Sequence, residues 1–162
     1  VLSTKENAME INDLVSPDGV FANLRVTSKK QAIQELARRA ADISGEPERV
    51  VFDVLMERER LGTTGVGNGI AIPHGKLEKV DRLYGMFARL EAPIDFQAID
   101  DQPVDLIFLL LAPETAGADH LKALARVSRL LRDTQTCEKL RGTNTVDGLY
   151  AILTESMESR AA

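Results

Sequence analysis

The run Val104–Ala112 constrains the fold more than any other part of the sequence, because apolar side chains occupy almost all of it. A strand with one side facing solvent alternates apolar and polar residues, whereas this run is apolar on both faces. Such a strand lies in the middle of a sheet and needs helices on each side to bury it. The run therefore predicts a three-layer α-β-α sandwich with a small mixed central sheet.

Helices are expected both before and after this run along the chain, and the other strands are expected before it. A weakly alternating segment comes first, and two amphipathic helices, a glycine-rich loop and two short strands follow it. The expected strands are 20–26, 70–73, 83–90 and 104–112, and the expected helices are 28–44, 46 to about 60, 119–132, 136–141 and 145–158. The element order is then β-α-α-β-β-β-α-α-α, which defines an α/β (α+β) fold class.

Local signals support several of these helices. Ser28 and Gln31 form a capping-box pattern at the start of the first helix, and Gly45 can supply the left-handed residue that ends it. The second helix is expected to bury Val50, Val51, Val54 and Leu55, and the third is expected to bury Leu121, Leu124, Ala125, Ser128 and Leu131.

Length, charge and hydropathy narrow the classes of function. The 162 residues suit one domain, expected over residues 9–162, with residues 1–8 as a disordered leader or an artificial remnant. A net charge of −5 and a pI near 5.1 argue against nucleic-acid binding. No apolar run approaches the ~20 residues of a membrane helix, so no membrane insertion is expected. Cys137 is the only cysteine, which fits a reducing compartment, and we expect a cytoplasmic location.

The sequence contains two histidines, and both stand at element boundaries. His74 follows a short strand in the segment Pro73-His-Gly75, where proline stiffens the chain and glycine lets another backbone come close. Such a turn holds an imidazole ring in place and also exposes it. The glycines around His74 could instead serve the geometry of a tight turn alone, and spacing does not decide between the two interpretations.

The second histidine, His120, opens the third expected helix of the chain, 119–132, which follows the central strand. Asp119 is its expected N-cap. Its ring would lie near free amides and the positive end of the helix dipole, a place that attracts anions and favours neutral imidazole. The alternative is an exposed residue at a helix start. Arg58 and Arg60 end the second helix just before the glycine-rich loop. Each is either solvated or able to make forked contacts to a phosphate beside His74.

Several familiar site patterns are absent from the sequence. A phosphate-binding P-loop needs four residues between its first glycine and Gly-Lys, but five separate Gly69 from Gly75-Lys76, and Leu77 follows. The glycines near position 67 lack the third glycine of a dinucleotide site and precede a strand. No spacing typical of metal ligands or of a serine hydrolase occurs, so we expect no metal and no cofactor.

Two segments carry a resemblance to a known family. The run Glu57–Lys76, together with Asp119-His120-Leu121, resembles the enzyme IIA family of the bacterial phosphotransferase system, in its fructose/mannitol class. Within that class, the segments 67–76 and 101–105 are similar to the nitrogen-regulatory branch. The likeness extends from about residue 9 to residue 153.

The resemblance implies a role for each candidate residue. His74 would accept a phosphoryl group on Nε2, and His120 and Arg58 would stabilise it. The resemblance further implies phosphate-binding roles for Arg60, Asn68 and Thr64, although mannitol-type relatives carry an acidic residue where Asn68 stands.

The implied partners follow from the same likeness. The phosphate donor would be a small histidine phosphocarrier protein of the HPr or NPr type. The phosphorylation state would signal nitrogen, carbon or potassium status through targets such as a potassium transporter or a sensor kinase. Two alternatives remain open: a sugar-transport enzyme IIA that passes phosphate to a IIB domain, and a binding module that has lost the transfer. The joint presence of both histidines and Arg58 speaks against the last.

Overall fold

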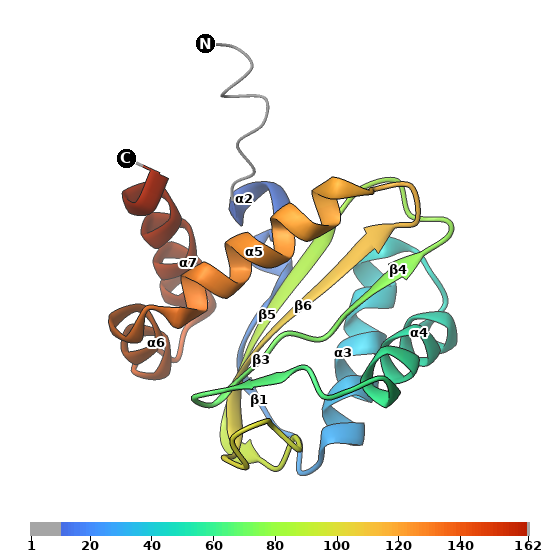
Figure 1. Ribbon diagram of the computed structural model, residues 1–162. Coiled ribbons are helices and arrows are strands. Elements are labelled where there is room, and N and C mark those ends of the chain that lie inside the picture. Colours follow the sequence, from blue (N-terminus) through green and yellow to red (C-terminus); the bar gives the residue numbers. More distant parts are fainter. Residues whose placement is uncertain (1–10, 162) are drawn as a thin grey trace.

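A mixed six-stranded sheet runs through the middle of the computed structural model, which describes residues 11–161 (Figure 1). The strands are β1 (Val20–Leu24), β2 (Gly65–Gly67), β3 (Ile70–Ala71), β4 (His74–Leu77), β5 (Tyr84–Ile94) and β6 (Val104–Pro113). The order across the sheet is β1-β5-β6-β3-β2, and β4 also pairs with β6. The leader expected at residues 1–8 lies outside the described residues.

β6 is the central strand, as its composition predicts. It pairs with β5 in antiparallel fashion on one side, and with both β3 and β4 in parallel fashion on the other. Ile107, Leu109 and Leu111 join one buried cluster, whereas Leu106, Phe108 and Leu110 join a second. Because successive side chains of a strand point to opposite faces, β6 contributes to the core on both sides of the sheet.

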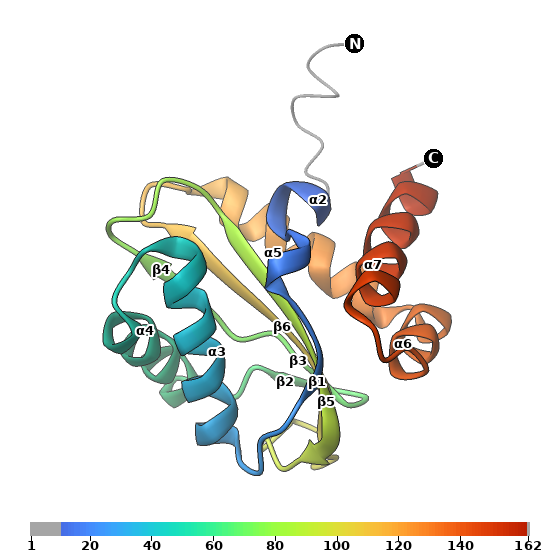
Figure 2. The ribbon, with the colours of Figure 1, turned by 180° about the vertical axis from the view of Figure 1, so that it is seen from behind.

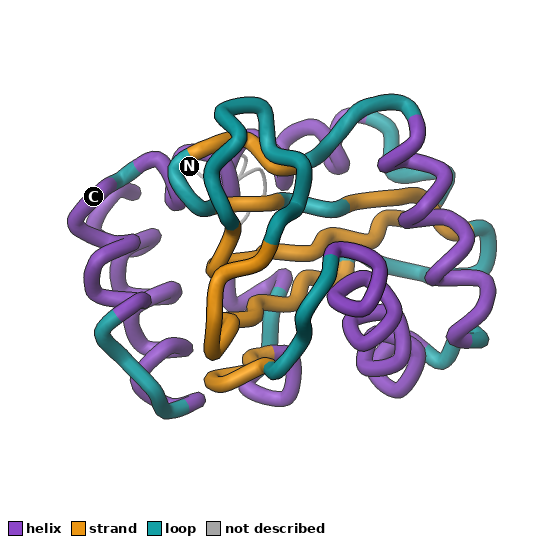
Figure 3. Tube along the Cα trace, turned by 90° about the horizontal axis from the view of Figure 1, so that it is seen from below, coloured by secondary structure: helices purple, strands orange, loops and turns teal. Residues whose placement is uncertain are grey.

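Helices cover both faces and form the outer layers. One layer consists of α3 (Lys29–Ser44) and α4 (Glu48–Arg60). The other contains α5 (Ala118–Arg132), α6 (Thr134–Arg141), α7 (Val146–Ala161) and the short α2 (Ile11–Leu14); a 3-10 turn at Pro17–Gly19 links α2 to β1. The two groups lie on opposite sides of the sheet in the view from behind (Figure 2) and in the view from below (Figure 3). The predicted three-layer sandwich is confirmed.

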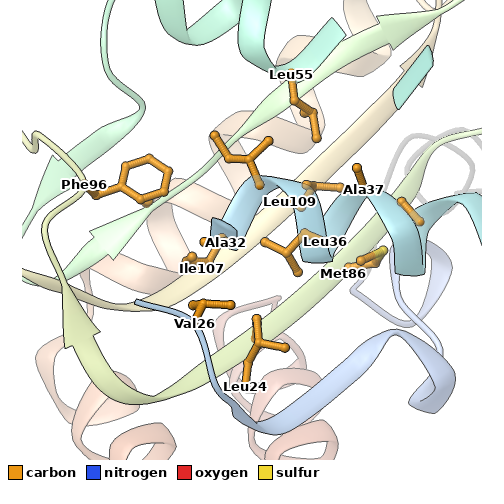
Figure 4. Packing of buried hydrophobic residues seen from close by; sticks show 14 of the residues in the cluster. Leu24, Val26, Ala32, Leu36, Ala37, Leu55, Met86, Phe96, Ile107 and Leu109 are labelled. Carbon is orange, nitrogen blue, oxygen red and sulfur yellow. The ribbon is translucent and has the colours of Figure 1, made fainter. Parts of the chain in front are cut away.

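The core beneath α3 and α4 shows how the sequence pattern is used. Ala32, Leu36 and Ala37 of α3 lie against Ile107 and Leu109 of β6 (Figure 4). Ser28 caps α3 by accepting a hydrogen bond from the Gln31 amide at 3.1 Å, and Gly45 ends the helix with φ 83°. The second half of the capping box differs, because the Gln31 side chain accepts from the amide of Thr27 rather than that of Ser28.

The sheet contains more strands than the sequence pattern indicates. The glycine-rich loop includes β2, which pairs with β3 in a hairpin. The expected strand 70–73 is shortened to β3, and a further strand, β4, follows it, because pairing along β6 passes from β3 to β4 across Ile72 and Pro73. Proline has no amide hydrogen to donate to a neighbouring strand, which accounts for the break. The described order therefore has five strands, not three, after α4, and it begins with α2.

The buried faces of two helices also differ from the prediction. In α5 the buried residues are His120, Ala123, Val127, Leu130 and Leu131, whereas Leu121 is 68% exposed. These five residues follow helical spacing from His120, so the face begins one position earlier than expected. In α4, Val51 and Leu55 are buried as predicted, but Val50 is 42% exposed. Among residues 11–161, no helix has the length and apolar character needed to cross a membrane.

Candidate active site

His74 is the first residue of β4, immediately after the break at Pro73. Its position is set by the sheet, because Leu110 of β6 lies opposite His74 and donates its amide to the carbonyl of Pro73 at 2.9 Å. The half-buried ring turns its Nδ1 towards the Ile72 carbonyl oxygen, 2.8 Å away. A carbonyl oxygen can only accept, so Nδ1 carries the proton in a neutral ring, and Nε2 is left with a free electron pair.

Arg58 reaches this Nε2 from the last turn of α4. Its Nε donates to His74 Nε2 at 3.3 Å, and its Nη1 donates to the carbonyl oxygen of Gly62 at 2.9 Å. The guanidinium group therefore links the end of α4 to the following loop and to Nε2 of His74. Arg60 is placed differently, since its Nη1 pairs with Glu57 on the exposed surface of the helix. The structure brings Arg58 to His74 and leaves Arg60 away from it.

His120 meets His74 from the start of α5. The two ring centroids are 5.7 Å apart, and their planes are inclined by 51°. The His120 side chain is buried, with the residue only 7% exposed, and its Nδ1 has no hydrogen-bond partner. Because a buried N–H without an acceptor is rare and costly, the proton of the neutral ring belongs on Nε2. His120 is thus a donor through Nε2.

The turn before α5 corrects one sequence prediction. The N-cap is Gly117, with φ 55°, and not Asp119, which lies inside the first turn. The amide of Asp119 donates to the Ala116 carbonyl at 3.1 Å. A positive φ of this kind is easily adopted by glycine, which explains why the helix begins two residues earlier than the Asp119 side chain suggests.

The electrostatic surroundings keep both rings neutral near pH 7. Burial lowers the pKa of His74 below its usual 6.5; the hydrogen bond to Ile72 partly opposes this, and the charge of Arg58 lowers the pKa further. Burial also lowers the pKa of His120, and so do the charge that His74 carries when it is protonated and the charge of Lys76. A neutral His74 has the unprotonated nitrogen that nucleophilic attack requires.

Thr64 and Asn68 occupy other surroundings. Thr64 is buried and gives both its amide and its hydroxyl hydrogen to the carboxylate of Glu59. This geometry favours a structural role for the Thr64 side chain over a phosphate contact. Asn68 lies at the tip of the β2–β3 hairpin with φ 58°. Its backbone amide donates to Asp100, and its backbone carbonyl oxygen accepts from Arg141.

Glu59 is a residue that the sequence interpretation missed. It is buried on α4 in the series Val51, Leu55, Glu59, which repeats every four residues and marks the inward face of the helix. A carboxylate at a buried position of an otherwise apolar stripe is a signal that could have found it, because buried charges need partners. Within residues 11–161, no three His, Cys, Asp and Glu side chains are grouped to hold a metal ion.

The arrangement places a guanidinium group beside an unprotonated ring nitrogen of His74. A family model described as "Phosphoenolpyruvate-dependent sugar phosphotransferase system, EIIA 2" matches residues 13–156. The chain belongs to this EIIA 2 family. It is therefore a component of the phosphotransferase system whose chemistry is phosphoryl transfer.

Relatives of the chain include nitrogen regulatory proteins and fructose-specific components. A nitrogen regulatory protein of Bradyrhizobium diazoefficiens is 59% identical over 145 residues, which cover 90% of this chain and 95% of the relative. A fructose-specific EIIA component of Haloferax volcanii is 39% identical over 132 residues, covering 81% and 86%. The crystal structure of the nitrogen regulatory protein IIA-Ntr from Neisseria meningitidis matches with a TM-score of 0.85 and 35% identity, covering 89% of this chain and 99% of the other.

Proposed function

We propose that this EIIA 2 protein is a regulatory phosphoryl carrier that accepts phosphate on Nε2 of His74 from a histidine phosphocarrier protein of the HPr or NPr type. The observation that carries the proposal is the hydrogen bond from Nδ1 to the Ile72 carbonyl oxygen. It fixes the tautomer in which Nε2 has a free electron pair. The same nitrogen is the one that faces Arg58.

The transfer is an in-line displacement on phosphorus. Nε2 of His74 forms a bond to phosphorus while the bond from phosphorus to the carrier's histidine nitrogen breaks, and that nitrogen keeps the electron pair. No proton has to move, because the hydrogen of His74 stays bonded to Nδ1, which donates it in the hydrogen bond to the Ile72 carbonyl oxygen. This hydrogen bond also supports the positive charge that the ring acquires on phosphorylation, consistent with its upward effect on the pKa of His74.

Arg58 and His120 stabilise the phosphoryl oxygens. Arg58 already lies against Nε2, so it must move from this nitrogen to an oxygen as phosphorus arrives, while Gly62 anchors its other arm. The Nε2 hydrogen of His120 supplies a further donor, and the start of α5 adds the positive end of its helix dipole. Arg60 and Asn68 are secondary candidates for phosphate binding, and Arg60 would have to leave Glu57 to take part.

The regulatory assignment is supported by the 59% identical relative, which is named a nitrogen regulatory protein. In this proposal the protein works in the cytoplasm, and targets such as a potassium transporter or a sensor kinase bind one phosphorylation state only. The alternative is a sugar-transport role, favoured by the fructose-specific relative, in which phosphate passes onward to a IIB domain.

The test is to incubate the protein with a phosphorylated carrier and to map the modification by mass spectrometry. We expect an acid-labile phosphate on His74. Adding purified fructose- and mannitol-type IIB domains then separates the two roles, because onward transfer supports the transport alternative and its absence supports regulation. A phosphate found on any residue other than His74 would refute the proposed acceptor.

A further inference from the structure

A buried ion pair joins α3 to α4 at Glu59, the neighbour in sequence of Arg58. Lys29, the first residue of α3, places its Nζ 2.9 Å from Oε1 of Glu59, near the end of α4. The side chains are only 15% and 3% exposed, respectively. Lys29 is also held over the ring of Phe96, with its Nζ 4.9 Å from the ring centroid. The pair joins the two helices that cover this face of the sheet.

The carboxylate of Glu59 also holds the loop that follows α4. Its Oε1 accepts the Thr64 amide at 3.0 Å, and its Oε2 accepts the Thr64 hydroxyl. With the ammonium group of Lys29, three donors converge on one buried carboxylate. Full hydrogen bonding of this kind is what makes a buried charge tolerable, and it fixes the position of Thr64 closely.

A short series of hydrogen bonds leads from Thr64 to the His74 ring. The carbonyl oxygen of Thr64 accepts the amide of Ile72 at 3.0 Å. The carbonyl oxygen of the same Ile72 accepts Nδ1 of His74 at 2.8 Å. Ile72, the residue whose carbonyl oxygen sets the tautomer of His74, is therefore tied through Thr64 to Glu59. Arg58, the residue before Glu59 on α4, contacts the opposite nitrogen of the ring.

We propose that Glu59, held by Lys29, is a positioning residue for phosphoryl transfer: it fixes Thr64 and Ile72, and through them the tautomer and orientation of the His74 ring. This inference rests on the proposed function, because it assumes that His74 is the acceptor. Stability alone is a weak reason for such a pair, since buried ion pairs often contribute little or nothing net to stability. The geometry at Nε2 of His74 is a stronger reason, because small displacements of this nitrogen slow a transfer that depends on its alignment with phosphorus.

The main test compares Glu59→Gln with Glu57→Gln. Both changes remove one negative charge within the last turn of α4, but Glu57 is on the exposed surface, paired with Arg60. In Glu59→Gln the amide can still accept from the Thr64 backbone, while the ammonium of Lys29 loses its counter-charge. We expect transfer at saturating phosphorylated carrier to slow by about 10- to 100-fold, with the KM for the carrier unchanged. Glu57→Gln should behave as the wild type.

A spectroscopic readout separates positioning from a merely structural role. Nitrogen-15 NMR of the His74 ring reports which nitrogen carries the proton. The wild type and Glu57→Gln should show one tautomer, protonated at Nδ1, whereas Glu59→Gln should show a mixture of tautomers. Wild-type tautomer and wild-type transfer rate in folded Glu59→Gln would overturn the inference, even if its melting temperature had fallen.

Thr64→Val decides the matter if Glu59→Gln does not fold. This change removes the hydroxyl bond to Glu59 and keeps the shape and the amide of residue 64. The inference is supported if Thr64→Val shows a mixture of tautomers and a slower transfer, with both effects smaller than those expected of Glu59→Gln. It is contradicted if the tautomer and the transfer rate are both those of the wild type. Failure of the proposed function is recognised separately, because the wild type would then carry no phosphate on His74.

Discussion

His74 and His120 lie 5.7 Å apart, centroid to centroid, yet the protein holds the two rings in different ways. His74 is fixed by hydrogen bonds at both nitrogens, one to the Ile72 carbonyl oxygen and one from Arg58. His120 is fixed by burial at the start of α5, and its Nδ1 has no hydrogen-bond partner. The hydrogen bonds of His74 therefore select one tautomer of its ring, whereas the packing around His120 fixes the position of its ring.

The difference matches the two separate tasks that we propose for His74 and His120. A nucleophile needs a defined nitrogen with a free electron pair, which the bond at Nδ1 provides. A group that stabilises developing charge needs a donor aimed at a fixed point, which a tightly packed ring provides. Substitutions at the two histidines, and at Arg58 beside His74, should therefore have different effects on transfer and on stability.

Replacing His74 by alanine should abolish phosphate uptake, because no other residue at the site presents an unprotonated ring nitrogen to the carrier. The ring is only half-buried, so we expect the fold to survive. Mass spectrometry after incubation with phosphorylated carrier measures the uptake, and far-ultraviolet circular dichroism checks the fold. An acid-labile phosphate on the folded variant would move the acceptor elsewhere.

Replacing His120 by alanine should leave His74 able to accept phosphate but slow the transfer, by about 10- to 1,000-fold for one lost preorganised donor. His120→Gln should restore part of the rate, since an amide can donate from a similar distance. The sequence places this ring at an exposed helix start, where we would expect a loss of at most about 1 kcal/mol in the free energy of unfolding. Because the ring is buried, we expect a larger loss of about 1–2 kcal/mol on replacement by alanine.

Transfer rates at matched carrier concentration and denaturant midpoints of the three proteins check this prediction. A rate loss that unfolding accounts for completely would remove His120 from the site, and so would a wild-type rate in the alanine variant.

Arg58→Lys should slow transfer by about tenfold despite keeping the charge, because an ammonium group cannot bind Gly62 and a phosphoryl oxygen with a planar fork. Arg49→Lys is the control on the same helix, because the native side chain is exposed and lies 3.9 Å from Asp53. Single-turnover kinetics with phosphorylated carrier compares the two. Equal rates for both variants and the wild type would mean that the fork of Arg58 is not used.

Much of the architecture could be predicted because it follows from strong local patterns. The apolar run of β6 specifies a central strand between two helical layers, and Ser28 and Gly45 mark the ends of α3. The break between β3 and β4 was missed because β3 has only two residues, too few for a period to be visible. The face of α5 was misjudged because Leu121 is apolar and His120 is polar, yet the ring is buried and the leucine exposed.

The site depends more on tertiary structure than the fold does. His74 and His120 are 46 positions apart in the sequence, and they meet because β4 pairs with β6 at Leu110 and the chain then returns over the sheet as α5. The sequence predicted both rings as candidates from their places at element ends. It could not show that Thr64 would turn to Glu59, because that contact depends on how the loop after α4 folds back against the helix.

The smallest expected effect concerns the pH dependence of stability. Burial lowers the pKa of both histidines below 6.5 in the folded protein, whereas the unfolded chain titrates near the usual value. Below about pH 7 the unfolded state therefore binds more protons than the folded state, and the free energy of unfolding falls as the pH drops through 6.5 towards the folded pKa values.

His120→Gln removes one of these groups, so its stability should decline less than that of the wild type between pH 7 and pH 5. Denaturant midpoints of both proteins across this range measure the difference, and since carboxylates titrate at lower pH in both, their contribution cancels in the comparison. Parallel curves would show that His120 takes up its proton as readily in the folded as in the unfolded chain, which its burial argues against.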